Sequence, residues 1–453
     1  MARVSILLIV VALIGGTIGC AQPAPTAQYN LTISSTDGGS VTTPGEGTFS
    51  YDEVTVVNLV AEPDEGYQFA NWTGDVTTIG NVNDAITIIT TNDSYEVTAN
   101  FALESLEIRD WHGLNAIRNN LGGSYTLMND LDSTTAGYEE LASEMANEGE
   151  GWEPIGTFDE PFTGALDGRT HEIRNFSAQR SGQDWVGLFG CIGRGGIVED
   201  LELANVVVVG NSYVGCLAGQ VYCGTVEGCQ CTGSVAGGWS AGGLVGLNGQ
   251  GTIRDAYSTC SVSGRHGVGG LVGTHFVGTV SNSYSTGNVS GEDDVGGLVG
   301  KNGGTVSCSY STGSVSGSVR VGGLAGSNGL ATVTDCYASG SVAGGQFTGG
   351  LIGYNGAAIA RCYSVGGVQG GSFVGGLVGF GDATTSFWDA ETSGCAESDG
   401  GTGKNSSEMR DILTFSRLSW HIVAVVHGET NKDYIWNIID GQTYPFLSWE
   451  PVS

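Results

Sequence analysis

The chain has 453 residues, a formal net charge of −31 and 78 glycines. This length allows several domains, and the glycines do not recur at every third position as they do in collagen. Lysine and arginine together number 16 and form no basic stripe, so we expect no nucleic-acid partner. We interpret the acidity as a source of solubility; weak surface binding of divalent cations such as calcium is the alternative.

Residues 1–20 have the features of a secretory signal peptide. Their apolar run, residues 4–14, is too short to span a membrane. Cys20 follows the tripeptide Thr-Ile-Gly, which resembles a lipobox. The resemblance implies that Cys20 carries a lipid anchor; ordinary secretion after cleavage and an uncleaved anchor are the alternatives. Residues 21–28 contain proline and alanine and are expected to form a tether.

Residues 29–102 are expected to form a small β module. Four segments alternate apolar and polar residues or are rich in β-branched residues, which predicts strands; they are residues 29–34, 54–61, 85–90 and 95–101. Ala61-Glu62-Pro63, Gly66-Tyr67-Gln68-Phe69 and Trp72-Thr73-Gly74-Asp75 resemble the divergent internalin-type B-repeat, which implies a β spacer. We interpret Trp72 as a core residue rather than a ligand-stacking one.

Residues 103–180 are expected to lead into the main domain and cap its N-terminal end. Apolar residues at helical spacing predict a short helix over residues 111–120. Residues 125–131 are then predicted to form a strand that opens the solenoid. The acidic residues 132–151 lack the oxygen spacing of a calcium loop, so we expect a solvated loop there.

Residues 181–385 repeat one pattern. A pentapeptide close to Gly-Gly-Leu-Val-Gly recurs, and the leucines of its eight copies are Leu188, Leu217, Leu244, Leu271, Leu298, Leu324, Leu351 and Leu377. Each unit holds three short apolar pieces separated by small polar residues and glycine, which disfavours helices and is typical of strands. One unit cannot bury its apolar face alone, whereas stacked units share a core. The pattern predicts an all-β fold, a parallel β-solenoid (β-helix) of about eight coils.

The same units carry a family resemblance. Gly-Gly-Leu-Val-Gly, Asn-Gly-Gly-Thr-Val, Ser-Tyr-Ser-Thr-Gly and Val-Ser-Gly, all within residues 296–317, resemble the GLUG motif repeats of bacterial and archaeal surface proteins. The first two units depart from the pattern at Phe189 and Cys216, as terminal repeats are expected to do. The resemblance implies a protein of the cell surface.

Residues 386–453 are expected to form a C-terminal cap. Asn405 and Glu408 have the spacing of a capping box, which predicts a short helix over residues 406–414. Several apolar side chains near the end of the chain are suited to covering the open end of the solenoid. They are Trp436, Tyr444, Pro445, Phe446 and Trp449.

Catalytic motifs are not found in this sequence. GLUG repeats accompany zinc peptidases in some immunoglobulin-cleaving proteins, but such sites need two histidines one helical turn apart, and His171 has no such partner. Asp255 and Asp335 share one column of the repeats, but three coils separate them by about 14 Å, too far for a glycosidase pair. The acidic residues 292–294 are interpreted as a solvated turn.

The cysteines of the repeats raise one structural question. Cys229, Cys336 and Cys362 occupy a column otherwise filled by alanine and serine, so we expect it to be inward and tight. Cys336 and Cys362 belong to consecutive units and should lie about 4.8 Å apart, within reach of a disulfide. Because in-register side chains point the same way, stacked free thiols are favoured, and a disulfide is the alternative. No zinc-type cysteine spacing is present.

These observations predict a secreted protein of the cell envelope, tethered to the membrane through Cys20. We expect a structural or adhesive role in which the solenoid binds an unknown surface protein or glycan, without a cofactor or a metal and without catalysis. A carbohydrate-active or proteolytic β-helix enzyme is the alternative from another class.

Overall fold

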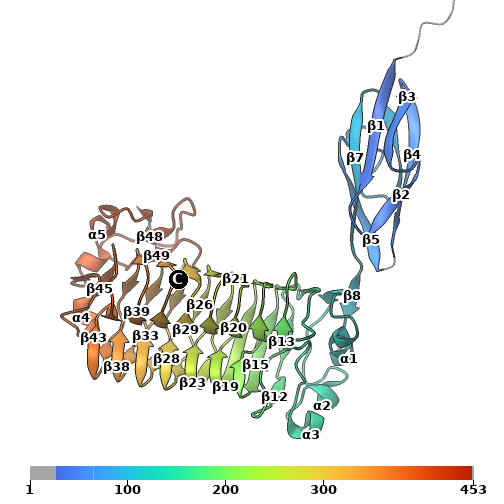
Figure 1. Cartoon of the computed structure of the whole chain (residues 1–453). Coiled ribbons are helices and arrows are strands. Elements are labelled where there is room, and N and C mark those ends of the chain that lie inside the picture. The colour runs from blue at the N-terminus through green and yellow to red at the C-terminus, as the bar shows by residue number, and fades with distance from the viewer. Residues whose placement is uncertain (1–26, 65, 451–453) are drawn as a thin grey trace, which may run out of the picture. The chain divides into compact units, whose positions relative to one another are not determined.

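The computed structural model describes residues 27–64 and 66–450, which belong to two compact units that meet in sequence at Glu104 and Ser105. Figure 1 shows both units. Cys20 and its proposed lipid lie outside the described residues. In the described part, no helix is both long enough and apolar enough to cross a membrane.

The N-terminal unit is a sandwich of two small sheets. One has the strand order β3-β1-β7-β5 and the other β2-β4-β6. Their strands are β1 (Gln28–Ser35), β2 (Gly39–Thr43), β3 (Gly47–Asp52), β4 (Thr55–Pro63), β5 (Tyr67–Gly74), β6 (Ile86–Thr91) and β7 (Tyr95–Leu103). Trp72 is 2% exposed among Leu31, Leu59 and Val97, and its indole N–H donates to the carbonyl of Asp84 at 3.1 Å. The prediction of a core tryptophan is therefore confirmed.

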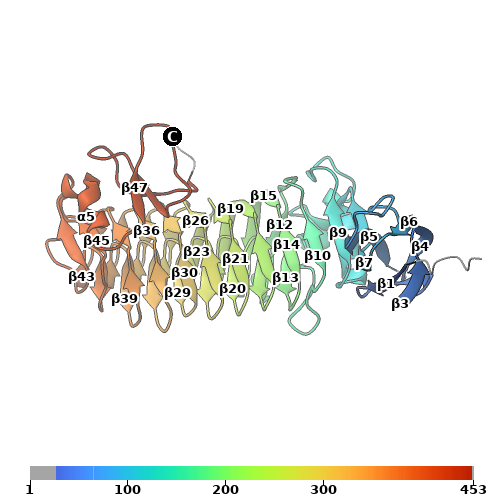
Figure 2. The same ribbon diagram turned by 90° about the horizontal axis from the view of Figure 1, so that it is seen from above.

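The C-terminal unit is a parallel β-solenoid (Figures 1 and 2). Its ten-stranded sheet comprises β8 (Ser105–Ile108), β9 (Ser124–Leu127), β10 (Ala165–Asp167), β14 (Ile197–Glu199), β18 (Thr225–Glu227), β21 (Thr252–Arg254), β25 (Thr279–Ser281), β30 (Thr305–Ser307), β35 (Val333–Thr334) and β40 (Ile359–Ala360). Its eight-stranded sheet comprises β13 (Phe189–Ile192), β17 (Ala218–Val221), β20 (Val245–Asn248), β24 (Val272–His275), β29 (Val299–Asn302), β34 (Ala325–Asn328), β39 (Ile352–Asn355) and β44 (Val378–Phe380).

A third sheet of 21 short strands closes the coils. It comprises β11 (Glu172–Arg174), β12 (Ser177–Gln179), β15 (Glu202–Val209), β16 (Ser212–Val214), β19 (Gln230–Gly242), β22 (Tyr257–Ser258), β23 (Ser261–Gly269), β26 (Tyr284–Ser285), β27 (Val289–Ser290), β28 (Asp293–Gly296), β31 (Tyr310–Ser311), β32 (Val315–Ser316), β33 (Val319–Gly322), β36 (Tyr337–Ala338), β37 (Val342–Ala343), β38 (Gln346–Gly349), β41 (Tyr363–Ser364), β42 (Val368–Gln369), β43 (Ser372–Gly375), β45 (Phe387–Asp389) and β46 (Thr402–Lys404). The leucines of the eight pentapeptides are at most 1% exposed and form one continuous core. The predicted solenoid is confirmed.

The stack of coils begins before the first pentapeptide repeat. β8 pairs in parallel with β9, β9 with β10 and β10 with β14, so the stack of coils begins at Ser105, within the predicted entry region and ahead of the repeats that start at residue 181. These first coils lack the pentapeptide but keep buried apolar strand residues such as Leu127 and Leu166. A strand can join the stack with such buried residues and without the pentapeptide. A search for the pentapeptide therefore does not detect the first coils.

The N-terminal approach contains more helix than expected. The predicted helix over residues 111–120 is present as α1 (Trp111–Asn115) followed by the 3₁₀ turn η1 (Ala116–Asn119). The predicted strand over residues 125–131 ends at Leu127. The acidic residues 132–151 are not a plain loop, because they form α2 (Tyr138–Leu141) and α3 (Ala146–Gly149) with their glutamates exposed.

Five tyrosines form a stacked ladder on the 21-stranded sheet. They are Tyr257, Tyr284, Tyr310, Tyr337 and Tyr363, with successive ring centroids 4.6 to 5.0 Å apart and interplanar angles of 2° to 10°. Register between coils is thus maintained in the side chains as well as in the backbone. Burial raises the pKa of Tyr284 to about 12.

The C-terminal aromatic residues cover this ladder and not the end of the solenoid, which corrects the prediction. Trp449 packs on Tyr310, and Trp436 packs on Tyr337 and Tyr363. The residues from Asn405 to Glu450, here called the C-terminal strap, fold back over the side of the last coils (Figures 1 and 2). Apolar composition predicts burial, but it does not say against which face.

The end of the solenoid is closed by the residues that precede the strap. Trp388 is 6% exposed and belongs to the continuous core. The Ser398 hydroxyl accepts from the backbone N–H groups of Leu377 and Val378 at 3.2 and 2.9 Å, which satisfies donors of the last coil. The final strand edge is therefore blocked by hydrogen bonds as well as by apolar bulk.

Within the strap, the predicted capping box is present. The backbone N–H of Glu408 donates to Asn405 Oδ1 at 2.8 Å, and that of Asn405 donates to Glu408 Oε2 at 3.1 Å. The predicted single helix is instead split into η2 (Glu408–Arg410) and α5 (Ile412–Ser416). Asp411 divides them because its extended backbone and side chain form a second N-cap. The strap ends in β47 (Ile422–Ala424), β48 (Trp436–Ile438) and β49 (Phe446–Leu447).

An inward amide column runs along the eight-stranded sheet and has one exception. Asn248, Asn302, Asn328 and Asn355 occupy it, and His275 replaces asparagine between the first two. Asn302 donates to Asn328 Oδ1 at 2.9 Å, and Asn328 donates to Asn355 Oδ1 at 2.8 Å. His275 is fully buried, its Nδ1 lacks a hydrogen-bond partner, and burial lowers its pKa to about 4.

Candidate functional site

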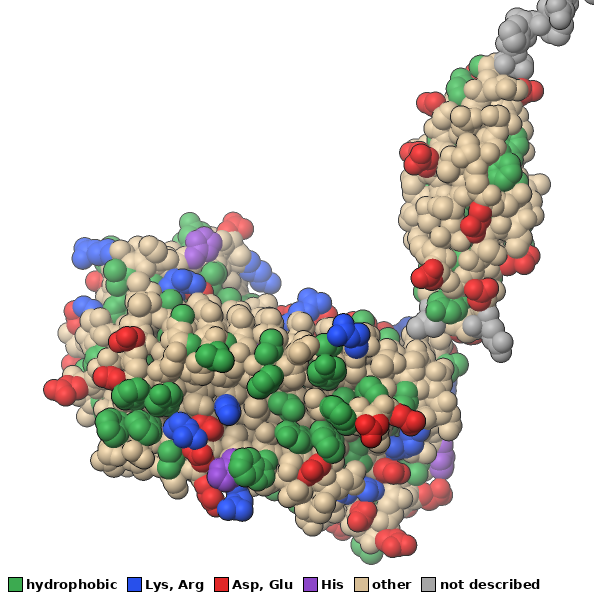
Figure 3. Space-filling view, in the orientation of Figure 1, with side chains coloured by type: hydrophobic (Ala, Val, Ile, Leu, Met, Phe, Trp, Pro, Cys, Tyr) green, Lys and Arg blue, Asp and Glu red, His purple; other side chains and the backbone are tan. Residues whose placement is uncertain are grey.

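A groove of about 640 Å³ lies on one side of the solenoid. The 21-stranded sheet contributes residues from β16 to β33, and the eight-stranded sheet contributes residues from β17 to β29. The turns that follow β17, β20 and β24 add Tyr222, Gln250 and Phe276. Figure 3 shows this face, on which hydrophobic side chains gather beside charged ones and a histidine.

One column of the repeat explains why the groove is hollow. Its members have φ between 51° and 65° and stand two residues before the pentapeptide, or one residue before it in the first unit; they are Trp185, Tyr213, Ser240, Gly267, Asp294, Arg320, Phe347 and Phe373. Large aromatic rings fill this column at both ends of the array, where Trp185 stacks on Tyr213 and Phe347 on Phe373. Ser240 and Gly267 leave it open in the middle, and this opening is the groove.

The left-handed backbone of this column also doubles the number of side chains that face the groove. In a regular strand, neighbouring side chains point to opposite faces. A residue in the left-handed region interrupts that alternation, as a bulge does. Accordingly Trp239 and Ser240 both line the groove, and so do Asp293 and Asp294.

Aromatic rings line the groove from the 21-stranded sheet and from the turns that follow strands of the eight-stranded sheet. Trp239 is 56% exposed and stacks on His266 of the next coil with centroids 4.1 Å apart. Phe276 is 66% exposed and Tyr222 is 41% exposed. Exposed rings of this size in a concave site form flat apolar platforms for a ligand.

Polar groups stand between these rings. The hydroxyls of Ser240 and Thr274 are 2.7 Å apart, and Lys301 lines the groove beside them. Arg320 donates to Asp294 Oδ1 at 2.6 Å and to Asp293 Oδ2 at 2.6 Å. The hydrogen bond to Asp294 is the main reason why the pKa of Arg320 is raised. The site thus offers hydroxyls, an ammonium group and oriented carboxylates.

The interpretation of residues 292–294 as a solvated turn is wrong for two of the three. Asp293 begins β28, and Asp294 is 8% exposed and bound to Arg320. Glu292 remains exposed, with Arg265 at 3.4 Å. The repeat places these carboxylates next to the arginine of the following coil, 26 or 27 residues later, which a local reading of charge does not detect.

The other predicted residues lie apart from the groove. Asp335 is 3% exposed, receives two hydrogen bonds from Arg361 and accepts from the indole N–H of Trp436 at 3.2 Å. Cys336 and Cys362 are buried on successive coils and are free thiols. Asp335 and these two cysteines therefore contact neighbouring coils and are not among the residues that line the groove.

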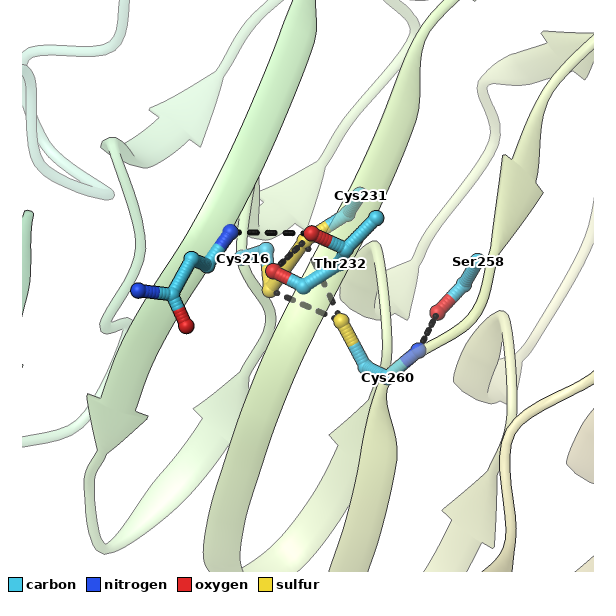
Figure 4. The surroundings of a disulfide bond; sticks show 6 residues. Cys216, Cys231, Thr232, Ser258 and Cys260 are labelled. Atoms are coloured by element: carbon cyan, nitrogen blue, oxygen red, sulfur yellow. Dashed lines mark hydrogen bonds between the residues drawn. A yellow bond between two sulfur atoms is a disulfide. The ribbon is translucent and has the colours of Figure 1, made fainter. Parts of the chain in front are cut away.

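The structure also contains a sulfur cluster that the sequence did not reveal. Cys216 and Cys231 form a disulfide, and the free Cys260 lies beside both (Figure 4).

The column that shapes the groove is visible in the sequence. It is the variable position ahead of each pentapeptide, which holds in turn Trp, Tyr, Ser, Gly, Asp, Arg and Phe.

Two protein families match parts of the chain. Residues 29–105 match the family described as "Divergent InlB B-repeat domain", and residues 237–263, 264–290 and 317–343 match "The GLUG motif". The resemblances drawn from the sequence are therefore confirmed for these segments.

Curated proteins also match parts of the chain. Over 132 residues the chain is 42% identical to Halomucin of Haloquadratum walsbyi, which covers 28% of this chain and 1% of that protein. Over 114 residues it is 35% identical to the "Putative Gly-rich membrane protein" of Evansella cellulosilytica, which covers 24% of this chain and 12% of that protein.

Solved structures are more distant. The crystal structure of a "putative immunoglobulin A1 protease" from Bacteroides ovatus aligns with a TM-score of 0.37 and 18% identity, covering 77% of this chain and 93% of the other. A structure named "IgA1 Protease" aligns with a TM-score of 0.37 and 14% identity, covering 81% and 29%.

Proposed function

We propose that this chain, a β-solenoid with GLUG motifs behind a divergent InlB B-repeat domain, is a cell-surface protein that binds carbohydrate in its lateral groove. The observation that carries the proposal is the set of exposed aromatic rings in the groove, the Trp239–His266 stack together with Tyr222 and Phe276. Sugars present apolar C–H faces to aromatic rings, and their hydroxyls pair with the side-chain donors and acceptors that stand between these rings.

The solenoid suits an extended glycan. Successive coils repeat about every 4.8 Å, and the groove crosses coils from Tyr213 to Arg320. Adjacent coils therefore present neighbouring contact points along one line. The B-repeat unit would serve as a spacer between this surface and the cell.

Binding without turnover fits the groove better than hydrolysis. A glycosidase needs one carboxylic acid to donate a proton and a second carboxylate on the other side of the bond. Asp293 and Asp294 are consecutive, and Arg320 binds both. Two carboxylates on neighbouring residues of β28 that are both held by one guanidinium do not flank a glycosidic bond from opposite sides.

The binding proposal predicts that Trp239→Ala lowers glycan affinity by about ten- to thirtyfold, because truncating an exposed ring at a binding centre costs roughly 1.4–2 kcal/mol. The measurement is a glycan array with the purified protein, followed by calorimetric titration of the best ligand. Val426→Ala, an exposed apolar residue of the strap, is the matched control and should bind like the wild type. Equal affinity of W239A and wild type for every bound glycan, or no bound glycan on the array, would refute the proposal.

Attachment to the membrane is a separate prediction. If Cys20 carries the lipid, Cys20→Ser is expected to move the protein from the membrane fraction to the medium or to leave the precursor uncleaved. Fractionation and intact mass measure both outcomes. Unchanged processing with unchanged membrane association would refute the lipid anchor and leave the groove proposal untouched.

A further inference from the structure

Three sulfur atoms from two successive coils meet in the interior of the solenoid. Cys216 lies between β16 and β17, Cys231 lies in β19, and Cys260 lies between β22 and β23. Cys260 Sγ is 3.4 Å from Cys216 Sγ and 3.2 Å from Cys231 Sγ. All three side chains are fully buried, and Figure 4 shows them pointing toward one another.

Each cysteine departs from its own column of the repeat. Cys216 stands where the next coils have Gly243 and Gly270, and Cys260 stands where they have Gly287 and Gly313. Cys231 pairs in register with Ser258, which pairs in turn with Ser285. Three departures in three columns therefore converge on one point, which singles out the cluster from the other cysteines.

The cysteines of the predicted ladder behave differently. Cys336 and Cys362 stand in one column on successive coils, and their Sγ–H groups donate to backbone carbonyls of Thr334 and Ala360 at 3.1 and 3.3 Å. Side chains in one column point the same way, and these two are free thiols. The cluster cysteines come from different parts of the coil and do face each other.

A metal ion suits the cluster less well than sulfur chemistry. A structural zinc site takes four ligands in tetrahedral geometry. In the described residues, these three cysteines alone form a cluster of three or more metal-ligating side chains. No histidine or carboxylate belongs to that cluster to complete a tetrahedral site.

We propose that Cys216, Cys231 and Cys260 form a thiol–disulfide exchange site, in which one cross-link can join any two of the three sulfurs. Cys260 loses its proton and attacks Cys231 Sγ, so that a Cys231–Cys260 bond forms while the Cys216–Cys231 bond breaks. The electron pair of the broken bond stays on Cys216 Sγ, which takes up a proton. The exchange is redox-neutral and needs no external oxidant.

The two cross-links constrain the array differently. Cys216–Cys231 joins two points within one coil, with a sequence separation of 15. Cys231–Cys260 would join one coil to the next, because Cys231 pairs in register with Ser258 of the following coil. Exchange would therefore convert a bond within a coil into a staple between coils at the same place in the core.

The repeat supplies variants that suit the fold. Cys216→Gly, Cys231→Ser and Cys260→Gly each restore the residue of the following coils. We expect Cys216→Gly to contain a Cys231–Cys260 disulfide, Cys231→Ser a Cys216–Cys260 disulfide, and Cys260→Gly the Cys216–Cys231 disulfide. The free thiols are first blocked in acidic denaturant, and disulfide-linked peptides are then mapped by mass spectrometry. Chymotrypsin is suitable because Tyr222 and Trp239, after which it cleaves, separate the three cysteines.

Cys336→Ser is the matched control and should leave the pairing of the cluster unchanged. Circular dichroism identifies the variants that fold. A folded Cys216→Gly or Cys231→Ser variant whose two remaining cluster cysteines are both free would overturn the proposal. If both of these variants fail to fold, the wild type is equilibrated with a trace of small-molecule thiol and its disulfides are mapped in the same way. Finding both the Cys216–Cys231 and the Cys231–Cys260 linked peptides supports exchange. Finding the Cys216–Cys231 peptide alone refutes it.

Discussion

Replacing Trp436 with alanine is expected to destabilise the C-terminal strap by about 3–5 kcal/mol, the usual range for truncating a buried tryptophan. Trp436 is fully buried, and its ring lies 5.0 Å from Trp420 and 5.8 Å from Tyr363. Its indole N–H also donates to Asp335 Oδ1 at 3.2 Å, so the substitution removes a partner of a buried carboxylate. The tyrosine ladder would lose its cover while the coils beneath it remain paired.

Hydrogen exchange distinguishes this local effect from global unfolding. Amides of the strap should lose protection in Trp436→Ala, whereas amides of β20 and β24 should keep it. Leu413→Ala, a residue of the same strap with 48% exposure, is the control and should change little. Equal loss of protection in the strap and in the central coils would show that the strap and the solenoid unfold together, which contradicts the expectation.

Replacing His275 with asparagine is expected to make the protein less sensitive to acid. The pKa of His275 is lowered to about 4 by burial, so between pH 6.5 and 4 the unfolded chain binds a proton that the folded chain does not. Stability must therefore fall as the pH falls through this window, by about 3 kcal/mol for a shift of this size. Asparagine also continues the amide column and removes the unpartnered Nδ1.

The measurement is the difference in unfolding free energy between His275→Asn and wild type at several pH values. A difference is needed because Glu450 acts with the opposite sign. Burial raises the pKa of Glu450 to about 7, so the folded state favours its protonated form and loses stability as the pH rises from about 4.5 to 7. A difference between variant and wild type that stays constant from pH 7 to pH 4 would contradict the assignment to His275.

The sequence was sufficient for the features that repeat. The eight pentapeptide leucines, from Leu188 to Leu377, recur at a nearly constant spacing. A leucine that recurs at the same position of every unit is expected in the shared core. The column of Cys336 and Cys362 followed from the same alignment of units, because register between coils is inherited from the period.

Features that depend on backbone conformation or on contacts between coils could not be predicted in this way. The groove requires a left-handed backbone at Ser240 and Gly267, so that neighbouring residues such as Trp239 and Ser240 line it together, and no periodicity reveals this. The cluster joins Cys216, Cys231 and Cys260 through spacings of 15 and 29 residues, far from the short spacings that mark cysteine sites. For the strap, aromatic content indicated burial but left its partner face undetermined.

The strap has a mechanical consequence for a protein built as a row of coils. In such a row each coil is held by its neighbours alone, so a pulling force would peel coils from a free end one after another. Trp449 reaches back to Tyr284 and Tyr310, and the Tyr363 hydroxyl donates to the carbonyl of Pro445 at 2.5 Å. The last coils are thus tied across several steps of the row and must yield together. Under tension the weakest point of the rod moves away from its C-terminal end.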